Sequence, residues 1–489
     1  MISSTIIWAA IAVFAVAGAI IAWLAQRANT GTAADYYLGG SRLGGMIAGL
    51  SYGATTYSAF MLVVLTGLTY RGGVGALGFE LIYFAGLTLL VVFAPRFWLA
   101  ARKWGFISPA EMVGARYGSP AVAKAMAAVA LVFLLPYCTT QMAGVGLLLS
   151  GVTGGGITLA QAIATGAVLA TLWTLLAGLR SVAWTDAAQA VVMLLSGAVA
   201  VAAAVAAIGG PRAFIDQTVQ NHGAWLDLPG PGLWSLPTFV ALAFPWFFFA
   251  ISNPQVSQRL FVARDFAAMR RMILWVLGFG LLFTLVAVIW GFAALHLVPG
   301  LENTAMATPA LLTSGAIPVP VAVLLVIGVL SAAVSTLESI ALTMGSMVAR
   351  DFLGARTGDA MQVFAGRLVV ILVIVFAAAF ALDTAKIVDQ LAALSSAGLL
   401  VTVPPIIGAF FWRRGTAAGV LACLAGGSVV AVVMALGLGV SVFNPALALT
   451  VAAVSTGLFV AVSLISQPRV GALDFADELR ADLDRHNAW

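Results

Sequence analysis

The feature that most constrains this chain of 489 residues is the recurrence of apolar segments about 20 residues long. A helix needs roughly that length to cross about 30 Å of bilayer hydrocarbon. Thirteen candidate spans follow one another, at 5–25, 44–68, 76–98, 124–149, 157–177, 182–208, 237–261, 272–297, 318–348, 363–382, 388–411, 416–438 and 445–466. We therefore predict an all-α protein that crosses a membrane many times, with lipid as its main surroundings.

The composition supports this class and excludes others. Hydrophobic residues make up 62% of the chain and charged residues 8%, which leaves too few polar side chains to cover a soluble protein of this size. The three histidines and two cysteines have no metal or redox spacing, and no nucleotide-binding loop is present in the sequence. The sequence thus favours neither an enzyme nor a nucleic-acid-binding protein.

The basic residues predict the orientation of the spans. An odd number of spans places the two ends of the chain on opposite sides of the membrane. With the N-terminus outside and the C-terminus in the cytoplasm, 20 of the 23 Lys and Arg residues lie in inner segments. Only Arg71, Arg212 and Lys386 lie outside. This asymmetry is the one that the positive-inside rule requires.

Two of the spans are poor membrane helices. The segment "AGLSYGATTYSAF" (48–60) is rich in hydroxyl side chains and glycine, and "AFPWFFFAISNPQ" (243–255) places Pro245 and Pro254 on either side of an aromatic run. At membrane depth, backbone carbonyls freed from a helix are tolerated where they line a cavity or bind an ion. Two interrupted helices at matching places predict a transporter built from inverted repeats. A packing face of small residues and a simple proline kink are the alternative interpretations.

This pattern divides the chain into six parts. They are an N-terminal extra helix with an inner loop (1–43), a first repeat of five helices (44–208), a polar outer loop (209–236), a second repeat of five helices (237–411), two further helices (412–466) and a cytoplasmic tail (467–489). The tail places Phe475, Leu479 and Leu483 on one helical face, which indicates either a short amphipathic helix or a solvated terminus.

Four strings in the sequence carry a resemblance to a known family. They are "DYYLGGSRLGG" (35–45), "RSVAWTDAAQ" (180–189), "NPQVSQRLFVARD" (253–265), and "AAVST" (332–336) followed by "ARDF" (349–352). In this order, the chain resembles the sodium/solute symporter family, which includes bacterial sodium/proline and sodium/sugar symporters. The resemblance implies a leucine-transporter-like fold, sodium-driven uptake by alternating access, a bacterial or archaeal inner membrane, and a monomer or weak oligomer.

The resemblance also implies a sodium site. It assigns as ligands the backbone carbonyls of Ala54, Tyr57 and Ala332 and the hydroxyls of Ser335 and Thr336. Positions 332, 335 and 336 share one helical face, and oxygen ligands without an obligatory carboxylate suit a monovalent cation. The alternative is that the two hydroxyls bond back to carbonyls one turn earlier in their own helix.

A second polar face adjoins the first. Some members of the family bind a second sodium ion through an aspartate that Asp186 matches, but this chain carries Glu338, beside Ser339, where a hydroxyl is expected. Two neighbouring carboxylates in a low dielectric are rarely both ionised without a cation between them. Either the site binds sodium more strongly or Glu338 takes up a proton, and a structural hydrogen bond is the third interpretation.

The residues around the solute are implied by the same resemblance. They are Ser58, Phe60, Gln141, Trp246, Ala250 and Asn253. Such a pocket is small and aromatic and has no evident Lys or Arg, so we expect a small amino acid or a monocarboxylate as the solute.

Two further charged residues have open roles. Glu80 contacts the solute or the coupling ion, or makes a helix-packing hydrogen bond; Arg259, near Arg264 and Asp265, is an inner-gate or structural charge. The predicted function is a sodium-coupled symporter that imports a small organic solute. The alternatives are a proton-coupled symporter that uses Glu338 and a transporter-like membrane module that senses a ligand.

Overall fold

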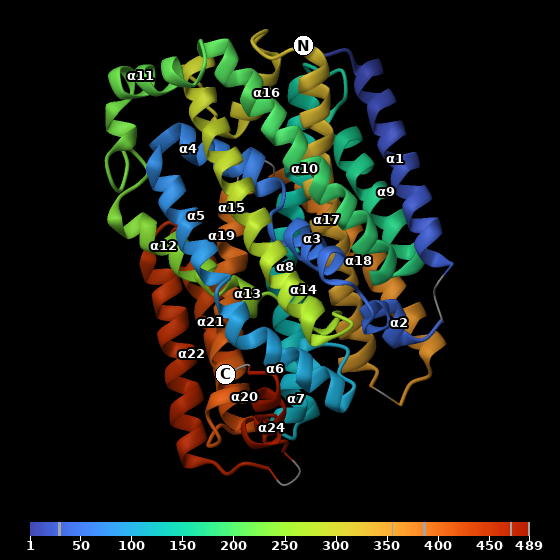
Figure 1. The fold of residues 1–489 in the computed structure, drawn as a ribbon. Helices are drawn as coiled ribbons and strands as arrows, with labels where there is room; N and C mark the ends of the chain where they lie inside the picture. The colour runs from blue at the N-terminus through green and yellow to red at the C-terminus, as the bar shows by residue number, and fades with distance from the viewer. Residues whose placement is uncertain (28–30, 355, 385–387, 470–471, 488–489) are drawn as a thin grey trace.

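The computed structural model describes residues 1–27, 31–354, 356–384, 388–469 and 472–487. Within these ranges the chain is helical throughout and has no β-strand, apart from an isolated bridge between Leu43 and Ala263. Figure 1 shows long helices that run between the two ends of the molecule. The all-α prediction is confirmed for the described part of the chain.

The helices follow in chain order. The first twelve α-helices are α1 (Ser4–Gln26), α2 (Ala33–Leu38), α3 (Gly45–Thr56), α4 (Thr66–Gly72), α5 (Val74–Gly86), α6 (Leu89–Trp104), α7 (Pro109–Arg116), α8 (Pro120–Val152), α9 (Leu159–Ala177), α10 (Leu179–Ile208), α11 (Pro211–Asn221) and α12 (Leu236–Phe247). They are followed by α13 (Phe249–Ser252), α14 (Pro254–Ser257), α15 (Phe266–Leu297), α16 (Ala307–Thr313), α17 (Val319–Met347), α18 (Asp359–Thr384), α19 (Val388–Leu399), α20 (Val403–Phe411), α21 (Ala417–Val432), α22 (Pro445–Ile465), α23 (Phe475–Glu478) and α24 (Arg480–Arg485).

Short helices of other types join these elements. The 3-10 helices are η1 (Gly39–Ser41), η3 (Gly223–Leu226), η4 (Gln258–Phe261), η5 (Thr304–Met306) and η8 (Leu400–Thr402). The π-helices are η2 (Met61–Leu65), η6 (Val348–Phe352) and η9 (Val433–Gly437).

The number of spanning helices differs from the sequence count of thirteen. Among the described residues, 11 helices are long and apolar enough to cross a membrane, and the bent pair Gly45–Thr56 and Met61–Gly72 raises the number to 12. The remaining expected span, 237–261, is divided into α12, α13, α14 and η4. Its longest piece has 12 residues, which is too short to cross the hydrocarbon as one helix.

The first interrupted helix lies inside the bundle. Helix α3 packs against α10, α15 and α17, while α1 packs on the outside against α9 and α10. In Figure 1 the N-terminus lies at the top of the molecule and α24 at the bottom. The orientation of the two ends relative to a membrane stays a prediction. Lys386, one of the three basic residues predicted outside, falls outside the described residues.

The polar segment 209–236 lies over the end of α4. The Trp225 indole donates to the carbonyl of Tyr70 at 2.9 Å, and the Trp234 indole donates to the carbonyl of Leu68 at 3.3 Å. The segment forms α11 and η3 rather than a membrane span, as its polarity predicts.

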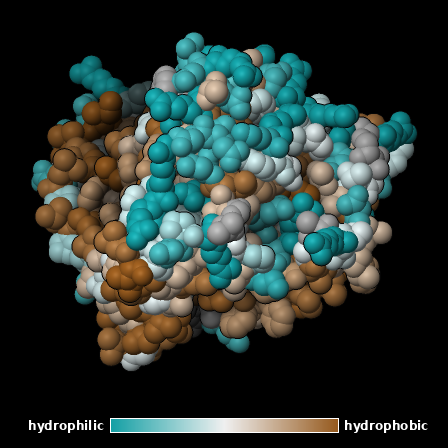
Figure 2. All heavy atoms as spheres, turned by 90° about the horizontal axis from the view of Figure 1, so that it is seen from below, coloured by the Kyte–Doolittle hydropathy of each residue, from teal (hydrophilic) through white to brown (hydrophobic). Residues whose placement is uncertain are grey.

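The C-terminal tail forms two short helices that dock on the bundle. Phe475, Leu479 and Leu483 are buried, and Phe475 stacks on Trp104 with ring centroids 5.0 Å apart. The amphipathic interpretation therefore describes the tail better than a solvated terminus. Figure 2 shows the bottom face of the molecule, where hydrophilic side chains cover the centre and hydrophobic ones gather toward the left and lower edges.

Candidate ion and solute site

The break in the first interrupted helix frees backbone carbonyls at the centre of the bundle. The last helical hydrogen bond of α3 runs from the Tyr57 N–H to the carbonyl of Gly53, at 2.8 Å. Tyr57 then takes an extended backbone (φ −98°, ψ 93°), and the chain resumes at an angle of 51°. The carbonyls of residues 54–57 consequently lose the N–H partners that a continuous helix would supply.

Hydroxyl groups of α17 donate hydrogen bonds to one of these carbonyls. The Ser335 hydroxyl lies 3.0 Å from the carbonyl oxygen of Ala54 and 3.2 Å from that of Ala332. The Thr336 hydroxyl lies 3.4 Å from the Ala54 oxygen and 3.1 Å from the Ala332 oxygen. The hydroxyls thus bond back to their own helix and also reach across to α3.

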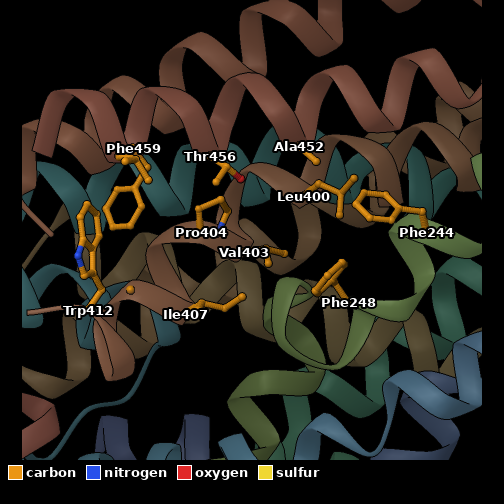
Figure 3. A pocket seen from close by; sticks show the side chains of 12 residues that line it. Phe244, Phe248, Leu400, Val403, Pro404, Ile407, Trp412, Ala452, Thr456 and Phe459 are labelled. Atoms are coloured by element: carbon orange, nitrogen blue, oxygen red, sulfur yellow. The ribbon is translucent and has the colours of Figure 1, made fainter. Parts of the chain in front are cut away.

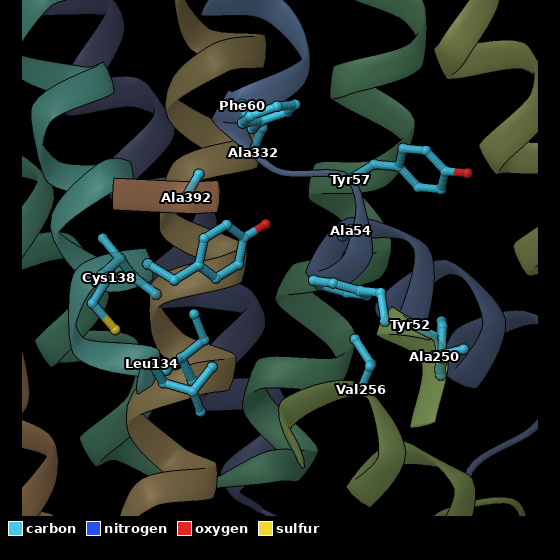
Figure 4. Close-up of a cluster of buried hydrophobic side chains, with 14 of the residues drawn as sticks. Tyr52, Ala54, Tyr57, Phe60, Leu134, Cys138, Ala250, Val256, Ala332 and Ala392 are labelled. Atoms are coloured by element: carbon cyan, nitrogen blue, oxygen red, sulfur yellow. The ribbon is translucent and has the colours of Figure 1, made fainter. Parts of the chain in front are cut away.

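Four of the five residues that the resemblance assigns to sodium therefore meet at one point. All four are fully buried, and the fifth, Tyr57, begins the break itself. In Figure 4 the Tyr57 side chain points away from Ala332, so only its backbone is available to this cluster. A buried position surrounded by neutral carbonyl and hydroxyl oxygens is suited to binding a hard monovalent cation.

The second polar face is held by Arg259. Its guanidinium Nη2 lies 2.8 Å from Oδ2 of Asp186 and also donates to the Ser339 hydroxyl. Ser51 bridges the same pair, since its hydroxyl donates to Asp186 Oδ2 at 2.7 Å and accepts from Arg259 Nε at 3.1 Å. All of these side chains are buried. The structure thus brings Asp186 and Ser339 together, with a protein cation between them.

Glu338 is different from its neighbours. It is fully buried and interacts electrostatically with both Asp186 and Arg259, and the Thr185 side chain of α10 lies close enough to hydrogen-bond with its carboxyl group. One guanidinium therefore faces two carboxyl groups in this cluster. The third interpretation, a structural hydrogen bond from Glu338 to a neighbouring helix, stays open.

Several predicted solute residues gather beside the break. The Ser58 hydroxyl lies 3.2 Å from the Tyr137 hydroxyl, and the Gln141 side chain accepts from the Ala59 N–H at 3.3 Å. The rings of Phe60 and Trp246 lie 5.0 Å apart. The segment after α3 is thereby joined to α8 and α12 at one place.

The second interrupted helix contributes less directly. Helix α12 ends at Phe247 and α13 at Ser252, and the next residue, Asn253, has an extended backbone (φ −93°, ψ 112°), so the predicted interruption is confirmed. Ala250 is buried on α13. The Asn253 amide donates to Ser252 at 3.1 Å and accepts from Gln255 at 3.3 Å. Asn253 therefore bonds within its own segment in this structure.

A separate cavity of about 300 Å³ lies between α12, α20 and α22. Figure 3 shows that apolar side chains line it, among them Phe248, Trp412 and Phe459. Because the lining has few polar groups and none of the carbonyls freed by the first break, this cavity lacks the chemistry of an ion or solute site.

The sequence left the partners of three residues unidentified. It placed Arg259 near one end of its span but gave no partner, and Asp186 lies 73 positions away. Ser51 and Tyr137 were also missed as bridging groups. The hydroxyl-rich string around Ser51 was the available signal, but nothing in it indicates which distant carboxylate Ser51 meets.

Comparison with known proteins identifies the family. The model of the sodium:solute symporter family matches residues 36–427, which is most of the chain. The chain belongs to the sodium:solute symporter family. The resemblance carried by the four strings is confirmed. The family consists of transporters rather than enzymes, in agreement with the prediction.

Curated relatives of this symporter-family chain match over parts of their length. YodF, an uncharacterised symporter of Bacillus subtilis, is 23% identical over 279 residues, or 56% of this chain and 55% of YodF. The human sodium/iodide cotransporter is 32% identical over 40% of this chain and 29% of its own length. A monocarboxylate transport permease protein of Rhizobium johnstonii is 27% identical over 36% and 35%. The chain thus spans about half or less of these relatives.

Solved structures share the fold over nearly the whole chain. A Na⁺-coupled sialic acid symporter in a substrate-bound, outward-open state has a TM-score of 0.77, with 19% identity over 95% of this chain and 98% of that one. Mhp1, a nucleobase-cation-symport-1 family transporter, has a TM-score of 0.58, with 17% identity over 91% and 98%. At these identities the likeness concerns the fold, which is of the kind that the resemblance implied.

Proposed function

We propose that this protein is a sodium-coupled secondary active symporter that imports a small organic solute by alternating access. The observation that carries the proposal is the meeting of the Ser335 and Thr336 hydroxyls with the freed carbonyl of Ala54. Family membership and the Na⁺-coupled structural neighbour support sodium as the coupling ion.

The geometry supports a coupling role for this cluster. Ala54 belongs to the interrupted helix, while Ala332, Ser335 and Thr336 belong to the continuous helix α17. An ion held by all of them, with the Tyr57 carbonyl, would join the break to a long helix and so favour one arrangement of the two. The solute residues Ser58 and Phe60 follow directly on the same break, so solute and ion act on one element.

The finer topology belongs to the same proposal. We take the bent pair α3 and α4 as one span and the four pieces between 236 and 261 as another, which gives thirteen. The proposed repeats are 44–208 and 237–411, and the proposed orientation has the N-terminus outside a bacterial or archaeal inner membrane. The two interruptions, one in each proposed repeat, support this division.

Proton coupling through Glu338 is the second candidate. It is favoured by one observation, that Arg259 forms its ion pair with Asp186 and none with Glu338. A proton can neutralise the Glu338 carboxylate without displacing any neighbouring side chain. The predicted second sodium ion would instead have to displace the Arg259 guanidinium from Asp186 and Ser339.

The proposal is tested by uptake into proteoliposomes under separate sodium and proton gradients. The solutes are alanine, proline and propionate, which represent the small amino acids and monocarboxylates. We expect accumulation that follows the sodium gradient. Uptake that follows only the proton gradient would replace the coupling ion, and binding without accumulation under either gradient would favour the ligand-sensing module.

A further inference from the structure

Glu80 is a buried carboxyl group without a partner at the edge of the solute region. It lies on α5 with no exposed surface, and neither of its carboxyl oxygens has a hydrogen-bond partner. The Tyr57 hydroxyl, which lies near Glu80, pairs with Thr284 and does not supply that partner. Burial of an unpaired carboxyl group is costly, so Glu80 needs an occupant that donates hydrogen bonds.

The surroundings of Glu80 are the hydroxyls that border the first break. The hydroxyls of Tyr57, Tyr83 and Tyr137 lie within electrostatic range of its carboxyl group. Tyr83 donates to the freed carbonyl of Thr56 at 3.1 Å, and Tyr137 contacts the Ser58 hydroxyl at 3.2 Å. Glu80 therefore belongs to the same region as the proposed solute contacts.

No protein cation balances this carboxyl group. Among the ion pairs of the described residues, the buried pair in the core joins Arg259 to Asp186, and none involves Glu80. An ionised Glu80 needs a positively charged partner when it is buried. Because the described part of the chain supplies none, that partner must come from outside the chain.

Aromatic rings surround the same place. The Trp246 ring lies 5.2 Å from Tyr83, 5.7 Å from Phe79 and 5.0 Å from Phe60. Phe79 and Tyr83 flank Glu80 on α5, one residue before it and three residues after it. Aromatic faces attract cations, most strongly where water is excluded.

We propose that Glu80 is the recognition group for a protonated amine on the solute, which pairs with the Glu80 carboxylate while the rings around Trp246 cover its positive charge. The inference rests on the proposed symport function, since the amine is carried by the same solute. It narrows the solute class: a small amino acid or another amine fits, whereas a monocarboxylate without an amine brings a second negative charge to Glu80. Phe60, Tyr83 and Trp246 are at most 5% exposed, so these rings must separate for the solute to enter.

The first test compares matched sets of ligands on the purified full-length protein in sodium buffer. One set is proline, pyrrolidine and cyclopentanecarboxylate, and the other is alanine, ethylamine and propionate. A ligand that binds the folded state raises the melting temperature. We expect stabilisation by members of these sets that carry an amine. Equal or greater stabilisation by the two carboxylates would overturn the proposal, and so would stabilisation by none of the amines while sodium alone still stabilises.

The second test uses Glu80→Gln, which keeps the size of the side chain and removes its charge. A hydrogen bond to a charged group contributes about 1.5–3 kcal/mol, so the affinity for the amine should fall about 10- to 100-fold. Sodium-induced stabilisation should stay unchanged, which shows that the variant is folded. Glu302→Gln, in an exposed loop, is the matched control and should bind like the wild type.

Two outcomes separate this inference from others. Unchanged amine affinity in Glu80→Gln, whether or not the pH profile flattens, would overturn the recognition role, and a flattened profile would make Glu80 a proton site instead. Amine binding that depends on Glu80 but brings no uptake under a sodium gradient would support the recognition role and contradict symport.

Discussion

Arg259 and Asp186 form an ion pair at the centre of the bundle, with 2.8 Å between Nη2 and Oδ2 and with both side chains almost completely buried. Arg259 reaches this position from η4 and Asp186 from α10, so the pair joins the second interrupted helix to the first proposed repeat. Together with Ser51 of α3 and Ser339 of α17, it connects four segments that are far apart in the sequence.

Breaking this pair from one side should destabilise the protein strongly. Arg259→Gln leaves the Asp186 charge buried without its partner, which costs about 3–5 kcal/mol. We expect a clearly lower melting temperature in detergent. The double variant Arg259→Gln with Asp186→Asn should recover part of that loss, because no unpaired charge remains.

The control for this experiment is the pair formed by Arg264 and Asp265 at the surface. Their Nε and Oδ2 atoms lie 2.9 Å apart, but both side chains are about half exposed. Solvent screens such a pair, so Arg264→Gln should melt close to the wild type. Equal losses in Arg264→Gln and Arg259→Gln would show that burial does not strengthen the inner pair.

Glu338→Gln tests whether Glu338 exchanges a proton during transport. Because Arg259 pairs with Asp186, the neutral form of Glu338 is the one that suits its buried position. Glutamine copies that form, so we expect folding and sodium affinity near the wild type and uptake that varies less with pH. The measurement is the initial rate of uptake at fixed sodium between about pH 5 and pH 8. An unaltered pH profile with unchanged ion stoichiometry would make Glu338 structural.

Phe475→Ala should release the C-terminal tail from the bundle. Its ring stacks on Trp104 and lies 5.4 Å from the ring of Phe410, and removing a buried phenylalanine costs about 3–5 kcal/mol. We expect faster amide exchange over 474–485 with little change in the spanning helices. Asp484→Ala, at an exposed position of the same tail, should exchange like the wild type. Unchanged protection in Phe475→Ala would mean that the tail is held elsewhere.

The positions of the spans were predictable because hydrophobic length is a local property of the sequence. The interruption after Thr56 was predictable from the hydroxyl and glycine content around it, and the interruption near Phe248 from Pro245 and Pro254. The subdivision of 237–261 into four short helices was not, because the bounds of the pieces depend on packing against α5 and α17. Hydropathy averaged over about 20 residues shows that segment as one span.

The candidate site was predictable where the family resemblance supplied a partner. Ala54 and Ser335 lie 281 residues apart, and their hydrogen bond could not be inferred from spacing alone. The role of Arg259 shows the opposite case. Its place near one end of a span was readable, but its guanidinium lies at the very site where a second cation was expected, and only the folded chain shows that Asp186 and Ser339 already have this partner.

The most direct test of sodium coupling is the sodium concentration for half-maximal uptake in Ser335→Ala and Thr336→Ala. Each change removes a hydroxyl that reaches the Ala54 carbonyl, so we expect this concentration to rise about tenfold or more, since a lost bond to a charged group contributes about 1.5–3 kcal/mol. Ser331→Ala is the control, because Ser331 is buried on the same helix but bonds to the carbonyl of Ile327. A rise in the first two variants and none in the third is the predicted result. Sodium dependence that stays unchanged in all three would contradict the assignment of this cluster as the sodium site.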